Sequence, residues 1–244
     1  MTFPYYKKIT NILEEVVTKE ENTIQKTISL FVETIKGKRQ MFAFGASHAG
    51  IVTEELFYRA GGLALINPIL ESSMMLNTRP VTQTSKMERL EGYGRIIGEK
   101  TPFKKDDVLL VHSVSGRNAV AIDLVLYAKE KGVKIVAITN LDYSKNVTSR
   151  HSSGKRLFEL ADIVIDNHGE KGDACIEIEG ITQKVAPTST VVSTTIMNIV
   201  VSEVALRLAE EGITPPVFHS ANVDGGDDHN KKLFEEYKDT IHYM

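Results

Sequence analysis

The sequence predicts a doubly wound α/β protein, in which helices cover both faces of a parallel β-sheet. Short runs rich in Val, Ile and Leu alternate along the chain with helical segments, as expected for parallel strands buried on both faces. Apolar residues make up 42% and charged residues 25% of the 244 residues, which is ordinary usage for a globular protein. No fixed-period repeat or Pro- and Gly-rich linker divides the chain.

The first 36 residues are predicted to form an N-terminal helical arm. Apolar residues recur there at spacings of three and four, with an interruption near residues 19–22, and this periodicity is typical of an amphipathic helix. Apolar strands are predicted at 40–44, 63–66, 108–112, 134–139 and 162–166. Further helices are predicted at 51–60, 86–98, 118–131, 188–211 and 231–241. The arm (1–36) is thus followed by a sheet domain (37–212) and a C-terminal tail (213–244).

Composition excludes several kinds of partner. A net charge of −3 gives no broad attraction for the phosphates of nucleic acid, so no nucleic-acid partner is expected. Cys175 is the single cysteine and cannot form an internal disulfide, which fits a reducing compartment. Charged residues interrupt the apolar runs, and Met1 to Lys8 lack the apolar stretch of a secretory signal. We therefore expect a cytoplasmic protein with no membrane partner.

Two loops that follow strands carry the chemistry of a phosphate site. Residues 45–50 (GASHAG) combine small residues and a hydroxyl at the start of a helix, whose free N–H groups attract anions. This loop alone fits equally well a tight turn in which Ser47 caps the helix. Residues 113–118 (SVSGRN) again place hydroxyls and a glycine before a helix. The predicted ligand contacts are Ser47, His48, Ser113, Ser115, Gly116 and Asn118.

Neither a cofactor nor a metal is expected. Ser47 stands where the second glycine of a G-x-G-x-x-G dinucleotide loop belongs. The second strand is followed by Asn67 and Pro68, so it offers no acid for a ribose hydroxyl. The acids of the tail (Asp224, Asp227, Asp228) and His229 match no standard metal spacing.

The two loops resemble the phosphosugar loops of SIS (sugar isomerase) domains, and residues 185–190 (VAPTST) are similar to the turn that completes the ligand pocket there. The resemblance covers roughly residues 35–212 and implies a flavodoxin-like, five-stranded sheet that binds a sugar phosphate. It adds Thr188 and Ser189 to the predicted contacts. The whole chain is similar to small bacterial SIS-domain proteins labelled phosphoheptose isomerases, and residues 196–212 resemble N-acetylmuramic acid 6-phosphate etherases.

The resemblance also implies catalytic residues for an isomerase, which moves a proton between adjacent sugar carbons through an enediol. Glu91 stands in a Glu-Gly pair like that of the etherases and is the predicted base. The alternative interpretation is that Glu91 is an ordinary exposed glutamate on a helix face. Glu54 and Glu55 are second choices. His229, in a polar tail segment (219–230) expected to complete the pocket, is predicted to assist ring opening, by analogy with SIS enzymes that receive a histidine from a neighbouring subunit. Helix capping by the tail acids is the alternative there.

Three functions remain open. One is an aldose or ketose phosphate isomerase, and the second is an amino-sugar phosphate etherase, for which Arg117 or Arg79 would meet a substrate carboxylate. The third is a non-catalytic phosphosugar sensor that acts through a protein partner. A homo-oligomer is expected, because the arm exposes an apolar stripe that the sheet domain does not obviously cover.

Overall fold

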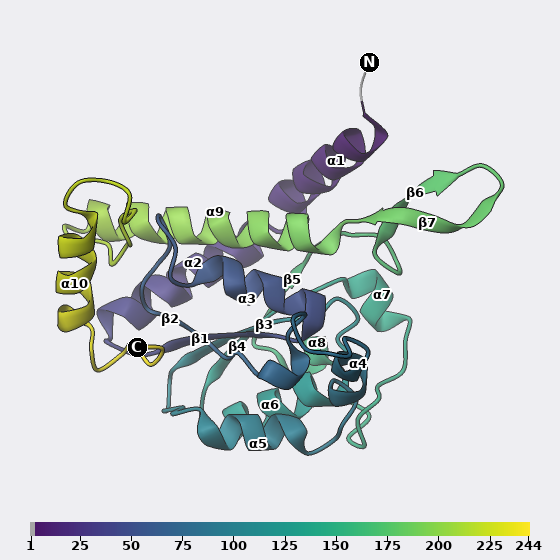
Figure 1. Ribbon diagram of the computed structural model, residues 1–244, viewed down its shortest axis with the longest axis horizontal. Helices are drawn as coiled ribbons and strands as arrows, with labels where there is room; N and C mark the ends of the chain where they lie inside the picture. The colour runs from purple at the N-terminus through teal and green to yellow at the C-terminus, as the bar shows by residue number, and fades with distance from the viewer. Residues whose placement is uncertain (1–2) are drawn as a thin grey trace.

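A five-stranded parallel β-sheet forms the centre of the protein, as the computed structural model, which describes residues 3–244, shows (Figure 1). The strand order is β2-β1-β3-β4-β5, and every neighbouring pair is parallel. This is the order of a flavodoxin-like doubly wound sheet, so the predicted fold class is confirmed. The strands are β1 (Met41–Gly45), β2 (Ile66–Pro68), β3 (Val108–His112), β4 (Lys134–Thr139) and β5 (Ile163–Asp166).

The order of the strands reverses at β1. The chain passes from β1 to β2 on one side and then returns to β3 on the other. Loops leaving the carboxyl ends of β1 and β3 therefore part from each other, and this is where open α/β sheets bind their ligands.

Helices cover both faces of the sheet (Figure 1). They are α1 (Pro4–Lys19), α2 (Glu21–Lys36), α3 (Gly50–Leu56), α4 (Gln83–Met87), α5 (Tyr93–Lys100), α6 (Ala119–Glu130), α7 (Leu141–Lys145), α8 (Leu157–Leu160), α9 (Ser189–Glu210) and α10 (Gly226–Glu236), with 3₁₀ turns at Ser47–Ala49 and Ser72–Met74. Along β1, Met41 and Ala43 enter the core beneath α2, α3 and α9, whereas Phe42 and Phe44 enter the core beneath α5 and α6. The alternation follows from the two-residue period of a strand.

The N-terminal helices are part of the larger core. α1 and α2 are separated at Glu20, within the predicted interruption, while residues 1 and 2 of the predicted arm lie outside the described residues. Buried side chains of both helices, including Val16, Ile28 and Phe31, join the core beneath α9. Helix α9 is long and apolar enough to cross a membrane by length and composition. It packs here against α2 and α3, and its buried face is part of the same core.

Four predicted elements differ in the structure, and one of them is the helix predicted at 51–60, which ends at Leu56. The predicted helix 86–98 is wrong as a single helix, because the chain leaves the helical path between α4 and α5, and Gly92 there has a left-handed φ of 88°. The second strand begins at Ile66 rather than residue 63, and the last helix spans Gly226–Glu236 rather than 231–241.

An antiparallel hairpin precedes α9 and was not predicted. Its strands are β6 (Ala174–Ile178) and β7 (Ile181–Pro187), and it extends away from the sheet beside α1 (Figure 1). The sequence signal was weak, because apolar residues alternate for only a few positions around Glu179 and Gly180. The hairpin ends at Pro187, and Thr188 alone separates it from the start of α9.

Candidate functional site

A cavity of about 280 Å³ lies between the loops that follow β1 and β3. Ser47 and His48 line it from the first loop, and Ser113, Ser115 and Asn118 line it from the second. The structure thus brings five of the predicted contacts to one cavity at the carboxyl ends of the strands. The wall is completed by residues that include Glu88, His112, Tyr143 and Asp173.

The first loop folds tightly because two glycines allow its ends to meet. A Cβ on Gly45 would lie 2.3 Å from the carbonyl oxygen of Ala49, and one on Gly50 would lie 2.9 Å from the carbonyl oxygen of Gly45. Ser47 adopts a left-handed φ of 56°, which is uncommon for a residue with a side chain and is found at functional sites. Ser47 lines the cavity from within this turn.

The second loop needs glycine at position 116 for two reasons. Gly116 has a φ of 58°, and a Cβ there would lie 2.9 Å from Ser144 Oγ and 3.2 Å from Leu157 Cβ. Its carbonyl oxygen accepts a hydrogen bond of 2.8 Å from the Leu157 N–H. Gly116 therefore allows the loop to pack closely on α8 while Ser113 and Ser115 remain on the cavity side.

Helix α6 begins at the cavity without a side-chain cap. Asn118, the residue before it, makes no capping hydrogen bond and instead donates Nδ2–H to Glu88 Oε2 at 2.7 Å. The first N–H groups of a helix have no partner within the helix, and they favour an anion at that end. In α6 the Val120 N–H already donates to the Glu88 carbonyl oxygen at 3.1 Å, so the other N–H groups of the first turn are the donors for a ligand. The start of α6 and the hydroxyls of Ser113 and Ser115 together provide donors suited to a phosphate group.

His112 holds the two loops in position. It is buried at the end of β3, and its Nδ1–H donates to the Ala49 carbonyl oxygen at 3.0 Å. Nε2 is then the acceptor, and the Ser193 hydroxyl of α9 lies 3.1 Å from it. Burial lowers the pKa of the His112 imidazole, so the ring is neutral at pH 7. A neutral ring with one donor and one acceptor matches both partners.

Glu88, rather than Glu91, is the glutamate at the cavity. Glu88 lines the cavity wall next to Asn118, and burial raises the pKa of its carboxyl, with the Asn118 hydrogen bond acting in the opposite direction. A carboxylate with a raised pKa at a cavity is suited to proton transfer. The Glu-Gly pair drew attention to Glu91, whereas the helix break that turns Glu88 inward depends on contacts distant in sequence.

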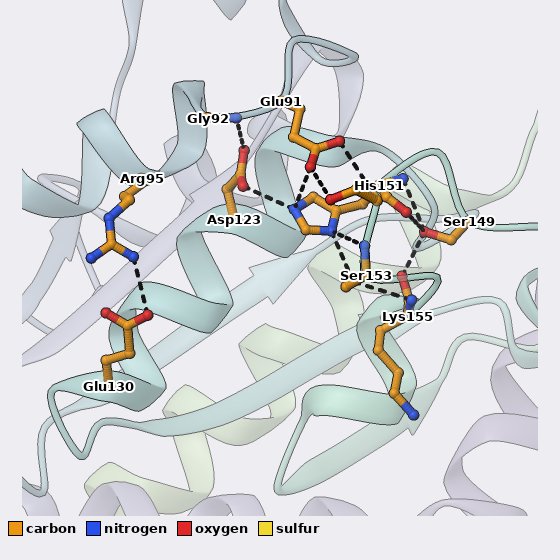
Figure 2. A network of polar contacts seen from close by, with 10 residues as sticks. Glu91, Gly92, Arg95, Asp123, Glu130, Ser149, His151, Ser153 and Lys155 are labelled. Atoms are coloured by element: carbon orange, nitrogen blue, oxygen red, sulfur yellow. Dashed lines mark hydrogen bonds and ion pairs between the residues drawn. The ribbon is translucent and has the colours of Figure 1, made fainter.

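Glu91, itself exposed, points to a separate network in which the side chains of His151 and Asp123 are largely buried (Figure 2). Its carboxylate accepts hydrogen bonds from the N–H and hydroxyl of Ser152, and these lower the pKa of the Glu91 carboxyl. His151 Nε2 lies 3.6 Å from Glu91 and 3.0 Å from Asp123 Oδ1. The Ser153 N–H donates to His151 Nδ1 at 3.0 Å, so Nε2 carries the proton that Asp123 accepts.

This network joins the loop of residues 146–156 to the segment between α4 and α5. The Asp123 carboxylate also accepts the Gly92 N–H at 2.6 Å, so α6 is tied to the break before α5. The loop of residues 146–156 lies against the second phosphate loop, because the Arg150 N–H donates to the Arg117 carbonyl oxygen at 2.9 Å. The network therefore positions the segment that carries Glu88, although Glu91 itself does not line the cavity. The second-choice residue Glu55 pairs with Arg59 and Asn198, and Glu54 does not line the cavity either.

The start of α9 is capped by Asp173 instead of being open to a ligand. Asp173 Oδ1 accepts the N–H groups of Thr188 at 2.9 Å and Ser189 at 2.7 Å, and Oδ2 accepts the Ser189 hydroxyl at 2.7 Å. Thr188 and Ser189 are buried and do not line the cavity. The expected phosphate contacts at this helix end are therefore corrected: a carboxylate of the chain fills that role, and Asp173 itself reaches the cavity.

The C-terminal tail lies away from the cavity of its own chain. His229 Nε2–H donates to the Val217 carbonyl oxygen at 3.0 Å, and its ring stacks on His219 at 3.8 Å. Further along, Asn67 of β2 donates its amide to the Thr240 carbonyl oxygen at 2.8 Å. Figure 1 shows α10 at the end of α9 opposite to the hairpin. The prediction that the tail completes the pocket is therefore wrong within one chain, because these polar groups form hydrogen bonds with nearby residues.

Within residues 3–244, no three His, Cys, Asp or Glu side chains are grouped to hold a metal ion.

The fold and the cavity define a class: a doubly wound α/β protein with a hydroxyl-lined ligand site at its switch point. Residues 4–140 match the family model described as SIS domain. The chain is 55% identical to a UPF0309 protein of Oceanobacillus iheyensis and 52% identical to one of Shouchella clausii, each over 98% of both chains. The chain therefore belongs to the SIS-domain family and, within it, to the UPF0309 proteins, which confirms the resemblance found in the sequence.

A solved structure shares this fold. The phosphoheptose isomerase GmhA from Neisseria gonorrhoeae superposes with a TM-score of 0.52, covering 84% of this chain and 95% of that one, at 13% identity. The matched SIS model begins within α1 and ends after β4, whereas the sequence resemblance was placed at roughly residues 35–212. The N-terminal helices are thus within the matched region.

Proposed function

We propose that this protein binds a sugar phosphate, with the phosphate group held by Ser47, Ser113, Ser115 and the start of α6. One observation carries the proposal. Three serines from two loops line the same cavity at a helix end that has no side-chain cap. Each hydroxyl can donate to a phosphate oxygen, and a hydrogen bond to an ion is about twice as strong as a neutral one.

We further propose that the ligand is a substrate, and that the reaction is interconversion of an aldose phosphate and a ketose phosphate. Glu88 removes a proton from the carbon next to the carbonyl carbon, which forms an enediol, and returns it to the former carbonyl carbon. The proton on oxygen moves between the two adjacent oxygens. The raised pKa of Glu88 supports this role, because a base that also returns the proton works best when its pKa lies near the working pH.

We also propose a homo-oligomer. Exposed apolar side chains gather on α1 and the hairpin, and they include Tyr6, Val17, Ile178, Ile181 and Val185. Symmetric pairing is the usual way to cover such a surface. Sedimentation at micromolar concentration should show an assembly of two or more chains, and a monomer of about 27 kDa would contradict the proposal.

The test of the proposed function has two stages. A thermal-shift screen of phosphorylated sugars with five to seven carbons, with the free sugars and inorganic phosphate as controls, identifies binding. A ligand at about 100 times its dissociation constant adds roughly 2.7 kcal/mol to the free energy of unfolding. Proton NMR in D₂O then follows the best ligand, because an enediol exchanges the carbon-bound proton with solvent. Binding without exchange would leave a phosphosugar sensor and reject the isomerase.

A further inference from the structure

Three arginines lie next to residues that line the cavity. Arg89 follows Glu88 and Arg117 precedes Asn118, and both Glu88 and Asn118 line the cavity. Arg150 belongs to the 146–156 loop and donates Nη1–H to Asn118 Oδ1 at 2.9 Å. Hydrogen bonds therefore link the three segments that carry these side chains, with Asn118 joining Arg150 to Glu88.

Among the described residues, these arginines form no direct ion pair, although Glu88 is close enough to act electrostatically on Arg89 and Arg150. Within residues 3–244, none of the three forms an ion pair with an aspartate or glutamate side chain. Arg117 donates Nη2–H to the neutral Thr148 hydroxyl at 3.1 Å, and its Nε–H is buried with no acceptor among the described residues. A buried donor without an acceptor costs free energy, so an acceptor that arrives with a ligand would remove this cost.

The arginines also repel one another. Burial, followed by the like charges of Arg117 and Arg89, lowers the pKa of the Arg150 guanidinium. An arginine remains charged at any physiological pH, so the three charges stay close together, and the Glu88 carboxylate, which raises the pKa of Arg150, compensates them only in part. Planar guanidinium groups match carboxylate and phosphate oxygens, often through two parallel hydrogen bonds.

We propose that Arg89, Arg117 and Arg150 form a second anion subsite, and that the ligand is a sugar phosphate carrying a second anionic group. This inference rests on the proposed phosphate site, which holds the first phosphate at Ser113 and Ser115. The second group is a carboxylate or a second phosphate located at the other end of the bound sugar, towards the cavity mouth. Asn118 then links the subsite to Glu88, so occupation of the subsite also orders the carboxylate at the cavity.

Matched pairs of ligands test the subsite by isothermal titration calorimetry. One pair is fructose 6-phosphate and fructose 1,6-bisphosphate, and the other is N-acetylglucosamine 6-phosphate and N-acetylmuramic acid 6-phosphate. Within each pair the second member adds a phosphate or a lactyl carboxylate. The wild-type protein should bind the second member of at least one pair about tenfold more tightly or better, because hydrogen bonds to charged groups are worth about one such factor each.

The triple variant Arg89→Gln, Arg117→Gln, Arg150→Gln should abolish this preference while its affinity for the first member of each pair stays within about threefold of wild type. If Arg117 proves necessary for folding, the double variant Arg89→Gln, Arg150→Gln should still reduce the preference. The control is Arg95→Gln, since Arg95 is exposed and pairs with Glu130 and Glu99, and it should keep the preference.

The outcomes separate this inference from the proposed function. Binding of singly phosphorylated sugars without any preference for the second member would overturn the subsite and leave the phosphate site standing. A preference that survives in the triple variant would also overturn it. If no phosphorylated sugar binds at all, the proposed function fails and the subsite fails with it.

Discussion

Replacing Glu88 by Gln should almost abolish turnover and should not weaken the fold. Glutamine has the same shape and still offers an oxygen to the Asn118 amide, which Glu88 accepts at 2.7 Å. Substrate binding should therefore persist, and the loss should fall on proton transfer. A positioned base contributes about 10²–10⁴-fold to the rate, which corresponds to about 2.7–5.5 kcal/mol of activation free energy.

Although Glu88→Gln should lower the turnover rate, it should leave the stability of the fold unchanged or raise it. Burial raises the pKa of Glu88 in the folded protein, so the folded state disfavours the ionised carboxyl. The resulting cost is absent below the unfolded pKa and develops fully as pH rises through the folded pKa. At pH 7 the Glu88→Gln variant should therefore melt at the same temperature as wild type or higher. The rising limb of kcat/KM with pH should likewise lie above the ordinary pKa range of a glutamate.

Glu91→Gln provides the matched control. Hydrogen bonds from Ser152 lower the pKa of Glu91, so its contribution to stability is present above its unfolded pKa and is lost as pH falls through its folded pKa. This variant should keep turnover within about threefold of wild type and should melt slightly lower at pH 7. Both variants are followed by the same NMR assay. Normal turnover in the Glu88 variant, or a loss confined to the Glu91 variant, would refute the assignment of the base.

Two further predictions concern the fold around the cavity. Gly116→Ala should lower the free energy of unfolding by about 2–4 kcal/mol, because it combines a left-handed conformation with overpacking. Gly180→Ala has a φ of 76° but no atom within 4 Å of its Cβ position, so it should lower the free energy of unfolding by only about 1–2 kcal/mol. Equal losses in urea titrations would reject the crowding argument. Asp173→Ala should lower the free energy of unfolding by about 1–3 kcal/mol, because the cap of α9 is lost. Replacing the exposed Asp224 by Ala should change it by almost nothing. Calorimetric melts that show no difference between the two variants would contradict the capping role.

The positions of the strands and the two phosphate loops could be predicted because their signals are local, whereas the flavodoxin-like order of the strands followed from the resemblance to SIS domains. Continuous apolar runs mark the buried strands, and hydroxyls beside glycine mark a helix start near an anion. The position of Glu88 could not be predicted in this way. It depends on the Val120 N–H, which donates to the Glu88 carbonyl oxygen at 3.1 Å, and on Asp123, which accepts the Gly92 N–H. Both contacts join residues about thirty positions apart.

The start of α9 and the tail show a similar limit. Ser and Thr at a helix start indicate an anion site, yet a carboxylate of the chain can occupy it, and here Asp173 does so across the hairpin. The polar tail also suggested a functional role. Its side chains satisfy nearby backbone groups instead, as when Asn230 accepts the His219 N–H at 2.9 Å and donates to its carbonyl oxygen at 3.0 Å. Such local satisfaction depends on the path of the chain, which the composition of the segment does not reveal.

The most direct test of the phosphate site is the double variant Ser113→Ala, Ser115→Ala, titrated calorimetrically with the best sugar phosphate from the screen. Two hydrogen bonds to a charged phosphate are lost at about 1.5–3 kcal/mol each, so the dissociation constant should rise about 100-fold or more. The exposed Ser85→Ala should bind as tightly as wild type. A double variant that melts normally and binds the sugar phosphate with wild-type affinity would contradict the phosphate site at the end of β3.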